Sequence, residues 1–103
     1  MVMTEASSPE LIALEFDRRR DGMIHALDGG IWLHRHVWFG RAMAHVVSAD
    51  RAALLEFGRL YGLPESRLQF KPLKNPRTGV RTNAWHWDLA GRVLEAVSTR
   101  RLI

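Results

Sequence analysis

Histidine is the residue type in this sequence that is best suited to chemistry near neutral pH. Its imidazole can accept or donate a proton there, and the uncharged ring binds divalent metals such as zinc. His34 and His36 are two residues apart, so on a strand both side chains point to one face, where such a pair can hold one metal ion. No compact His-Glu-x-x-His motif is present, and histidines are more often structural or surface residues. The five histidines are His25, His34, His36, His45 and His86.

A second group of chemistry-bearing residues lies near the end of the chain, in the sequence Trp85-His86-Trp87-Asp88. In an extended chain the two tryptophans share one face and His86 points to the other, so inward-facing tryptophans would leave His86 exposed. Asp88 is either a catalytic carboxylate or the N-cap of a last helix. Capping is the simpler explanation because it needs no other residue, and a capping Asp88 could still orient His86.

A basic loop precedes these residues. Cations that reach outward from a loop can bind phosphate, and exposed aromatic rings can stack on bases, so the combination favours a nucleic-acid contact. The alternative is an ordinary solvated loop whose tryptophans fill the core, and both interpretations stay open. We assign phosphate contact to Arg35, Arg41, Lys71, Lys74, Arg77 and Arg81, and base stacking to Trp85 and Trp87.

The charge of this 103-residue chain is unevenly distributed. Its 15 Lys and Arg stand against 11 Asp and Glu, which gives a formal net charge of +4. Residues 1–28 hold three basic and six acidic residues, whereas residues 65–103 hold eight basic and three acidic residues. A basic last segment favours an anionic partner such as nucleic acid or a nucleotide, although a small protein can simply have one basic face.

Several classes of protein are excluded by what the sequence lacks. Without cysteine there are no disulfides, thiolate zinc sites, iron–sulfur clusters or cysteine nucleophiles, and a reducing compartment is compatible with the sequence. No apolar run approaches the roughly 20 residues of a membrane-spanning helix. The acidic, polar start MVMTEASSPE does not resemble a secretory signal, and glycine-rich nucleotide-binding motifs are missing. We therefore expect a cytoplasmic protein without membrane contact.

The elements that position these residues begin with an N-terminal extension, residues 1–30, expected to pack on or lie peripheral to a core spanning residues 31–103. Ser8-Pro9-Glu10 has the preferences of a helix start and Asp21-Gly22 those of a stop, so the segment between them is predicted as a helix. A strand stays open, because its apolar run LIALEF is short and mixed. Asp28-Gly29 then predicts a hairpin turn between paired strands at 23–27 and 30–34.

A helix over about residues 49–61 is the clearest element of the second half. Ser48 is the expected N-cap, and apolar residues recur at helical spacing. Gly62 and Pro64 end the helix, since glycine takes the left-handed conformation after a helix and proline prevents continuation.

The remaining elements are shorter. Residues 68–71 are predicted as a strand, 72–84 as a loop and 88–97 as a last helix. Because strands and helices interleave, the predicted fold class is α+β: a single small domain with a short mixed sheet and two or three helices.

Five segments follow one another in a distinctive order: Ile31–Arg35, His45–Asp50, Leu54–Leu63, Leu68-Gln69 and His86–Asp88. This order resembles a small prokaryotic and phage family known as domain of unknown function 4031. That family has an early strand ending in Tyr-Val-Asp-Asp and a His-Leu-Ile-Ala-Asp segment leading into a helix that ends Leu-Gly-Leu. A Phe-Gln strand and a closing His-Tyr-Asp follow. The resemblance covers about residues 31–97 and depends on order and spacing, because each motif is short.

The resemblance implies little about activity, because the family has none that is settled. It singles out His45, His86 and Asp88 and implies that both histidines meet at the edge of one sheet. This sequence differs from the family pattern at the paired aspartates, where it has His34-Arg35. If the family's chemistry needs two carboxylates for a hard cation, this chain has lost or changed it. A histidine cluster that includes His36 suits a softer divalent metal, or a phosphate, better.

These observations lead to one hypothesis and two alternatives. The leading hypothesis is a domain that binds nucleic acid or a phosphorylated ligand, with a pocket of His45, His86 and Asp88 that hydrolyses a phosphodiester. One histidine would act as general base and the other would stabilise the leaving group; the cofactor is unknown, and a divalent metal is compatible with the site. The first alternative is a non-enzymatic accessory factor of phage or plasmid type, whose tryptophans and basic loop dock another protein and whose histidines are structural. The second is a structural metal site. Under any of these hypotheses, a homodimer could bury some of the tryptophans.

Overall fold

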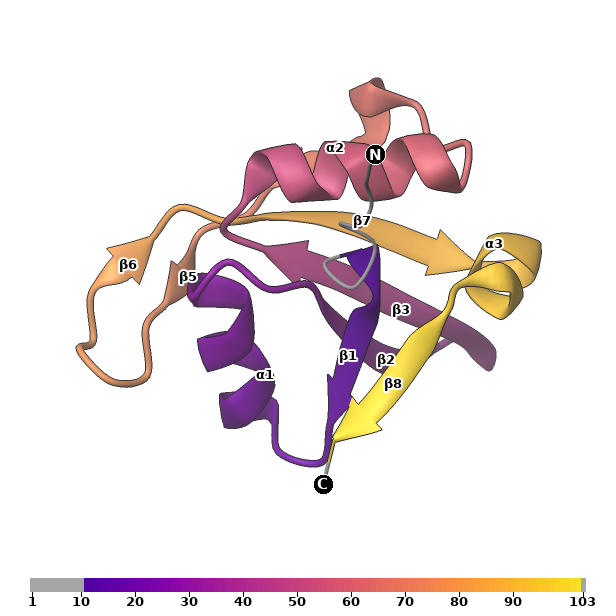
Figure 1. Ribbon diagram of the computed structural model, residues 1–103. Helices are drawn as coiled ribbons and strands as arrows, with labels where there is room; N and C mark the ends of the chain where they lie inside the picture. The colour runs from indigo at the N-terminus through magenta and orange to yellow at the C-terminus, as the bar shows by residue number, and fades with distance from the viewer. Residues whose placement is uncertain (1–10, 103) are drawn as a thin grey trace, which may run out of the picture.

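Six strands form one mixed sheet in the computed structural model, which describes residues 11–102 (Figure 1). β1 is parallel to both of its neighbours, and the other neighbouring pairs are antiparallel. In sheet order the strands are β4 (Gln69–Phe70), β7 (Trp85–Ala90), β3 (Arg41–Ser48), β2 (Trp32–Trp38), β1 (Ala13–Phe16) and β8 (Thr99–Leu102).

The remaining elements complete a single α+β domain, which confirms the predicted fold class. β5 (Leu73–Lys74) and β6 (Arg81–Thr82) pair as a small second sheet. The helices of the described residues are α1 (Arg19–Leu27), α2 (Arg51–Leu60), α3 (Gly91–Ala96) and the short 3-10 helix η2 (Glu65–Arg67). None of them has the length and apolar character that crossing a membrane would require.

The two faces of the large sheet are covered by different helices. In Figure 1, α2 lies above the sheet and α1 below it. The α2 face holds the main core, whose largest fully buried side chains include Trp87, Phe57 and Ile31. The α1 face holds a smaller core in which Ala26 of α1 packs with Trp32 and Val47.

Alternation along β7 sends neighbouring side chains to opposite faces of the sheet. Trp87 points toward α2, where its Nε1 donates a hydrogen bond of 2.8 Å to the carbonyl oxygen of Leu54. Gly58 permits this close packing, because a Cβ there would lie 2.5 Å from the Trp87 ring. His86 and Asp88 therefore point to the α1 face.

The N-terminal predictions are corrected by the structure. Residues 13–16 are a strand, and the helix covers residues 19–27, so the predicted strand at 23–27 and its hairpin turn at Asp28-Gly29 are wrong. Asp-Gly ends α1 instead, with the Asp28 N–H bonded to the Ile24 carbonyl and Gly29 at φ +99°. Ser8-Pro9-Glu10 lies outside the described residues. β1 lies between β2 and β8, so the segment named above as an extension contributes to the same sheet as the core.

The central helix is confirmed as α2, with a different N-cap. Asp50, and not Ser48, is the capping residue, because its carboxylate accepts a hydrogen bond of 3.1 Å from the Ala53 N–H. The Ser48 hydroxyl oxygen instead accepts the Asp50 N–H at 2.9 Å. Gly62 has the predicted left-handed conformation, at φ +71°.

The C-terminal predictions are only partly confirmed. The strand at 68–71 appears as the two-residue β4, and the segment 72–84 contains the strands β5 and β6 as well as loop. The predicted helix at 88–97 is wrong over its first three residues, because Asp88 lies within β7 and α3 begins at Gly91. The pairing of β7 with β3 satisfies the backbone there, so Asp88 does not cap a helix.

Candidate functional site

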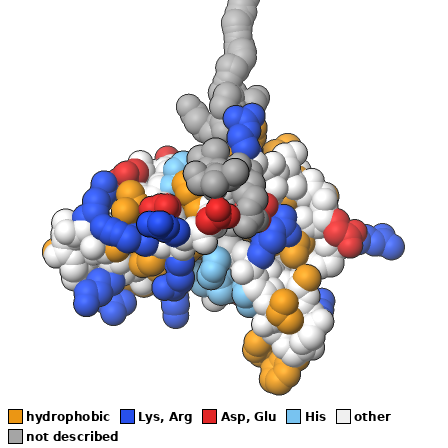
Figure 2. All heavy atoms as spheres, turned by 90° about the horizontal axis from the view of Figure 1, so that it is seen from below, with side chains coloured by type: hydrophobic (Ala, Val, Ile, Leu, Met, Phe, Trp, Pro, Cys, Tyr) orange, Lys and Arg blue, Asp and Glu red, His pale blue; other side chains and the backbone are white. Residues whose placement is uncertain are grey.

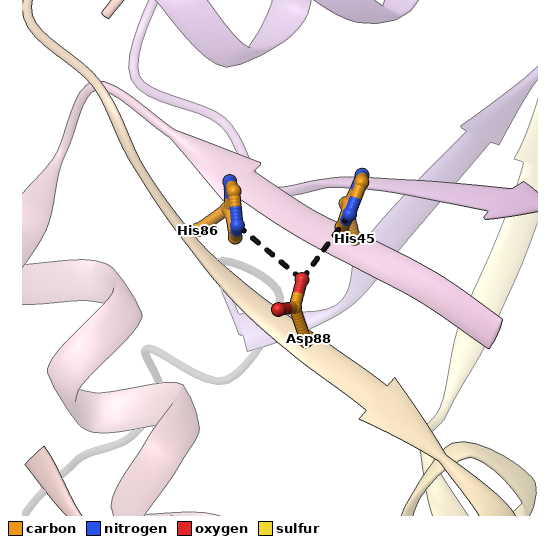
Figure 3. Close-up of side chains that lie close together, drawn as sticks. All are labelled: His45, His86 and Asp88. Atoms are coloured by element: carbon orange, nitrogen blue, oxygen red, sulfur yellow. Dashed lines mark ion pairs between the residues drawn. The ribbon is translucent and has the colours of Figure 1, made fainter. Parts of the chain in front are cut away.

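Three donor side chains converge on the α1 face of the sheet: His45, His86 and Asp88, called the His–Asp cluster below. His45 on β3 is directly opposite Asp88 on β7 in the strand register, and His86 precedes Asp88 by two residues on the same face. The distance to Asp88 Oδ1 is 3.2 Å from His45 Nε2 and 3.3 Å from His86 Nε2 (Figure 3). One donor atom from each residue lies within 4.8 Å of the others.

The orientation of the carboxylate is fixed by a neighbouring strand. Gln69 on β4 is opposite His86 in the register, and its Nε2 donates a hydrogen bond of 2.7 Å to Asp88 Oδ2. Because Gln69 holds Oδ2, the other oxygen, Oδ1, is directed at the two histidines. The sequence predicted a strand at Gln69 but gave no signal for this contact, which depends on the pairing of β4 with β7.

Further histidines extend the cluster across the sheet. The ring centroids of His45 are 4.7 Å from those of His86 and 4.6 Å from those of His36, and His34 is directly opposite His45. His36 Nδ1 is buried with no hydrogen-bond partner among the described residues. We call this surface the histidine face, and Figure 2 shows histidine side chains gathered at its centre, with Lys and Arg side chains to either side. His25 lies elsewhere, packed on Phe16.

The environment of His34, His45 and His86 lowers the pKa of each imidazole and so favours its uncharged form. Burial lowers the pKa of His45, and the neighbouring His86 lowers that pKa further, while Asp88 opposes both effects. Burial also lowers the pKa of His86 against the opposing effect of Asp88. Burial followed by the charge of Arg19 lowers the pKa of His34. A neutral imidazole keeps a free nitrogen lone pair, which both metal ligation and general-base catalysis require.

The donor set and its spacing fit a divalent transition-metal ion. Two imidazole nitrogens and one carboxylate oxygen are ligands that suit zinc and its neighbours, and three protein ligands leave a position open for water or substrate. Ligand bonds of ~2.1 Å in a tetrahedral arrangement place ligand atoms about 3.4 Å apart. The two distances to Asp88 Oδ1, 3.2 and 3.3 Å, are close to that value, and the three donor atoms as a set lie within 4.8 Å of one another, so an ion would draw them together. His45 and Asp88 have side chains 40% and 41% exposed, which leaves the cluster open to solvent.

The predicted phosphate-binding cations do not share one surface. Arg35 pairs with Glu15 at 2.7 Å and Arg77 pairs with Asp28 at 2.7 Å. Lys71 is the one whose charge acts on the cluster, since it lowers the pKa of His86. The others are exposed at two separate places, Arg41 at the β2–β3 turn and Lys74 and Arg81 on the small second sheet.

The tryptophans and His86 are placed differently from the sequence expectation. Trp87 is 2% exposed, so its ring faces are not available to a base, and it fills the core as the alternative interpretation held. Trp85 is partly buried and meets Phe70 edge-on. His86 is buried rather than exposed, because it lies beside Val47 in the strand register and stacks on the ring of His45.

Two features of this surface were missed by sequence reasoning. Arg19 lies close enough to His34 to act on its pKa, although nothing in the helix sequence marked it. The β2–β3 turn exposes three apolar residues in a row, Val37, Trp38 and Phe39. In the sequence, this run of large apolar side chains directly before Gly40 could have indicated an exposed apolar turn.

Comparisons with family models, curated proteins and solved structures found no match for this chain. The resemblance to domain of unknown function 4031 therefore stays a prediction, and the function must be argued from the site itself.

Proposed function

We propose that this protein binds a divalent transition-metal ion through the His–Asp cluster and hydrolyses a phosphodiester there, in nucleic acid or another phosphorylated ligand. The observation that carries the proposal is the convergence of two uncharged imidazoles and one oriented carboxylate on an open surface. A bound ion would polarise the phosphoryl oxygen and lower the pKa of a coordinated water.

The neighbouring side chains supply the rest of the chemistry. His34, opposite His45 in the register and uncharged near neutral pH, is the candidate general base for the attacking water. Water adds to phosphorus and its proton passes to His34, while the P–O bond to the leaving oxygen breaks. The leaving oxygen keeps the electron pair of that bond and takes a proton from solvent. Lys71 on one side and Arg19 on the other offset the charge that develops on the phosphoryl oxygens.

The charge of the chain supports a phosphorylated partner. The formal net charge is +4, and two cations, Arg19 near His34 and Lys71 near His86, lie close enough to lower the pKa of those histidines. Contacts between such cations and phosphate weaken steeply as salt increases, because counterions compete for the phosphate.

The test is metal-dependent hydrolysis of a chromogenic phosphodiester and of a labelled oligonucleotide. We expect activity with zinc, cobalt or manganese that is lost on chelation and falls at least ten-fold in Asp88→Asn. Asp50→Asn is the matched control, since it makes the same chemical change at a helix cap where asparagine serves as well as aspartate. Absence of hydrolysis with every metal, or equal rates in Asp88→Asn and the unmodified protein, would contradict the proposal.

A second candidate is a non-enzymatic interaction protein, favoured by the exposed apolar residues of the β2–β3 turn. Under this alternative the protein docks a partner through that turn and the histidines are structural or hold a structural metal. Metal binding without turnover, together with a higher unfolding temperature in the metal-bound form, would favour this second candidate.

A further inference from the structure

The turn between β2 and β3 presents a concentrated apolar surface to solvent. Val37, Trp38 and Phe39, called the hairpin tip below, are 72%, 60% and 88% exposed. The rings of Trp38 and Phe39 contact each other with centroids 4.7 Å apart and planes inclined by 57°. Contiguous exposed aromatic side chains of this kind mark interaction sites more often than chance exposure.

The tip also projects beyond the rest of the sheet. β1 pairs with β2 only at Trp32, and β7 pairs with β3 only from Met43 onward. Residues 37–42 therefore pair only with one another within the described sheet, and this turn lies at the right of Figure 1. A projecting position makes the aromatic faces accessible to a partner.

The backbone at the tip is not one that favours phenylalanine. Phe39 has φ +49°, the only positive φ at a non-glycine residue in the described part of the chain, and Gly40 follows at φ +74°. Two-residue hairpin turns of this type prefer Asn-Gly or Asp-Gly, because a bulky residue is strained in the left-handed region. A phenylalanine at this position therefore does not stabilise the turn, and we infer from its exposed ring that it has a binding role.

The charge of the hairpin fits an anionic partner. Residues 31–48 contain no Asp or Glu, and they carry two arginines and three histidines. Arg41 is exposed beside the tip, and Arg35 is half exposed although it pairs with Glu15. Both arginines line a hollow of about 430 Å³ with Leu94 and Glu95 of α3, on the face of the sheet opposite the histidine face. Flat apolar rings next to arginines match the bases and phosphates of a nucleic-acid strand.

The same two strands connect the tip to the His–Asp cluster. His45 follows Arg41 by four residues along β3, a span of ~14 Å at the rise of a strand. That span corresponds to about four stacked nucleotides. A nucleic-acid strand whose bases stack on the hairpin tip could thus place its phosphate backbone along the histidine face. This connection between the two surfaces favours nucleic acid over a lipid surface as the partner.

We propose that the hairpin tip is a base-stacking contact for single-stranded nucleic acid, which delivers the strand to the histidine face. The proposal builds on the proposed function and names its substrate class. Single strands are required because the bases of a duplex are already stacked on each other, so their faces are not free for Trp38 and Phe39.

The test measures binding of a labelled single-stranded oligonucleotide by fluorescence anisotropy in the presence of EDTA, so that neither metal nor hydrolysis contributes. We expect about ten-fold weaker binding for Trp38→Ala and for Phe39→Asn. Phe39→Asn removes the ring and places a preferred residue in the left-handed position, so its unfolding midpoint should equal or exceed that of the unmodified protein. Leu60→Asn is the control, because Leu60 is 60% exposed on α2, away from the hairpin.

Each other outcome overturns the proposal. Equal binding by Phe39→Asn and the unmodified protein removes the tip from recognition, and equal or tighter binding of a duplex removes the requirement for free bases. Binding of anionic vesicles but not oligonucleotide would assign the tip to a membrane, and a dimer lost in Phe39→Asn would assign it to a second copy. A failure of hydrolysis alone would overturn the proposed function and leave this binding comparison unchanged, because it is made without metal.

Discussion

The two faces of the sheet differ in what covers them, and β7 contributes to both. On the α2 face, Trp87 and Leu89 are closed in by apolar side chains of α2 and α3. On the histidine face, α1 packs at the end that holds Trp32 and Val47, while His45 and Asp88 beside them remain partly exposed. Because adjacent residues of one strand serve both faces, one face can supply the stability and the other the chemistry.

This division explains how a small domain can carry a polar cluster. His45 and Asp88 have side chains 40% and 41% exposed and so keep part of their hydration. His86 is buried, and the contact with Asp88 offsets its desolvation only in part. The covered face supplies the apolar burial that folding needs. Substitutions on the α2 face should therefore lower the free energy of unfolding, whereas substitutions on the histidine face should mainly weaken metal binding. The predictions run from the largest expected effect on the free energy of unfolding to the smallest.

Trp87→Ala should have the largest effect. It removes a ring that is 2% exposed and leaves the Leu54 carbonyl without its 2.8 Å hydrogen bond. We expect a loss of about 3–5 kcal/mol in the free energy of unfolding, measured by chemical denaturation. A loss below about 1 kcal/mol would show that the α2 face is not the main source of stability.

Gly58→Ala tests the close contact between α2 and the sheet. Alanine is the better helix former, but its Cβ would lie 2.5 Å from the Trp87 ring. The steric clash should outweigh the gain in helix propensity and lower the free energy of unfolding by about 1–3 kcal/mol in the same denaturation measurement. A gain in stability would mean that the helix moves away from Trp87 at little cost.

Asp50→Ala tests the cap of α2. Removing the carboxylate that accepts the Ala53 N–H should lower the free energy of unfolding by about 1 kcal/mol. Ser48→Ala separates the two candidate caps, since the Ser48 hydroxyl oxygen accepts the Asp50 N–H and not an N–H of the first helical turn. A larger loss for Ser48→Ala than for Asp50→Ala would restore the cap expected from the sequence.

The pH dependence of stability should report on the histidine face. Burial lowers the pKa of His34, His45 and His86 below the ordinary 6.5, so the folded protein binds fewer protons than the unfolded chain as the pH falls. The free energy of unfolding should therefore be full above about pH 6.5 and decrease toward pH 5. Denaturation midpoints across this interval test the sign, and a stability that rises toward acid would contradict it.

Local signals in the sequence predicted the features that depend on nearby residues. The helix at 51–60 was recognisable because its apolar spacing, a polar start and Gly62 all lie within one segment. The Asp28-Gly29 pair led to the wrong prediction of a hairpin turn, because the same two residues are also common at the end of a helix. Asp88 also misled, because Leu89 and Val93 have a helical spacing although Leu89 belongs to a strand.

Contacts between distant strands could not be predicted in the same way. His45, His86 and Asp88 were grouped by their resemblance to a family pattern, but their geometry depends on the register of β3 with β7. The Gln69 contact depends on β4 pairing at the edge of the sheet. Such pairings join residues far apart in the chain, so no local pattern specifies them.

The most direct test of the central claim is a calorimetric titration with zinc of the unmodified protein, Asp88→Asn and Asp50→Asn. We expect one bound ion per chain, binding at least ten-fold weaker in Asp88→Asn, and unchanged binding in Asp50→Asn. Because Asp88 is partly exposed, Asp88→Asn should also change the free energy of unfolding of the metal-free protein by less than about 1 kcal/mol. No zinc binding, or equal affinity in all three proteins, would contradict a metal centre at His45, His86 and Asp88.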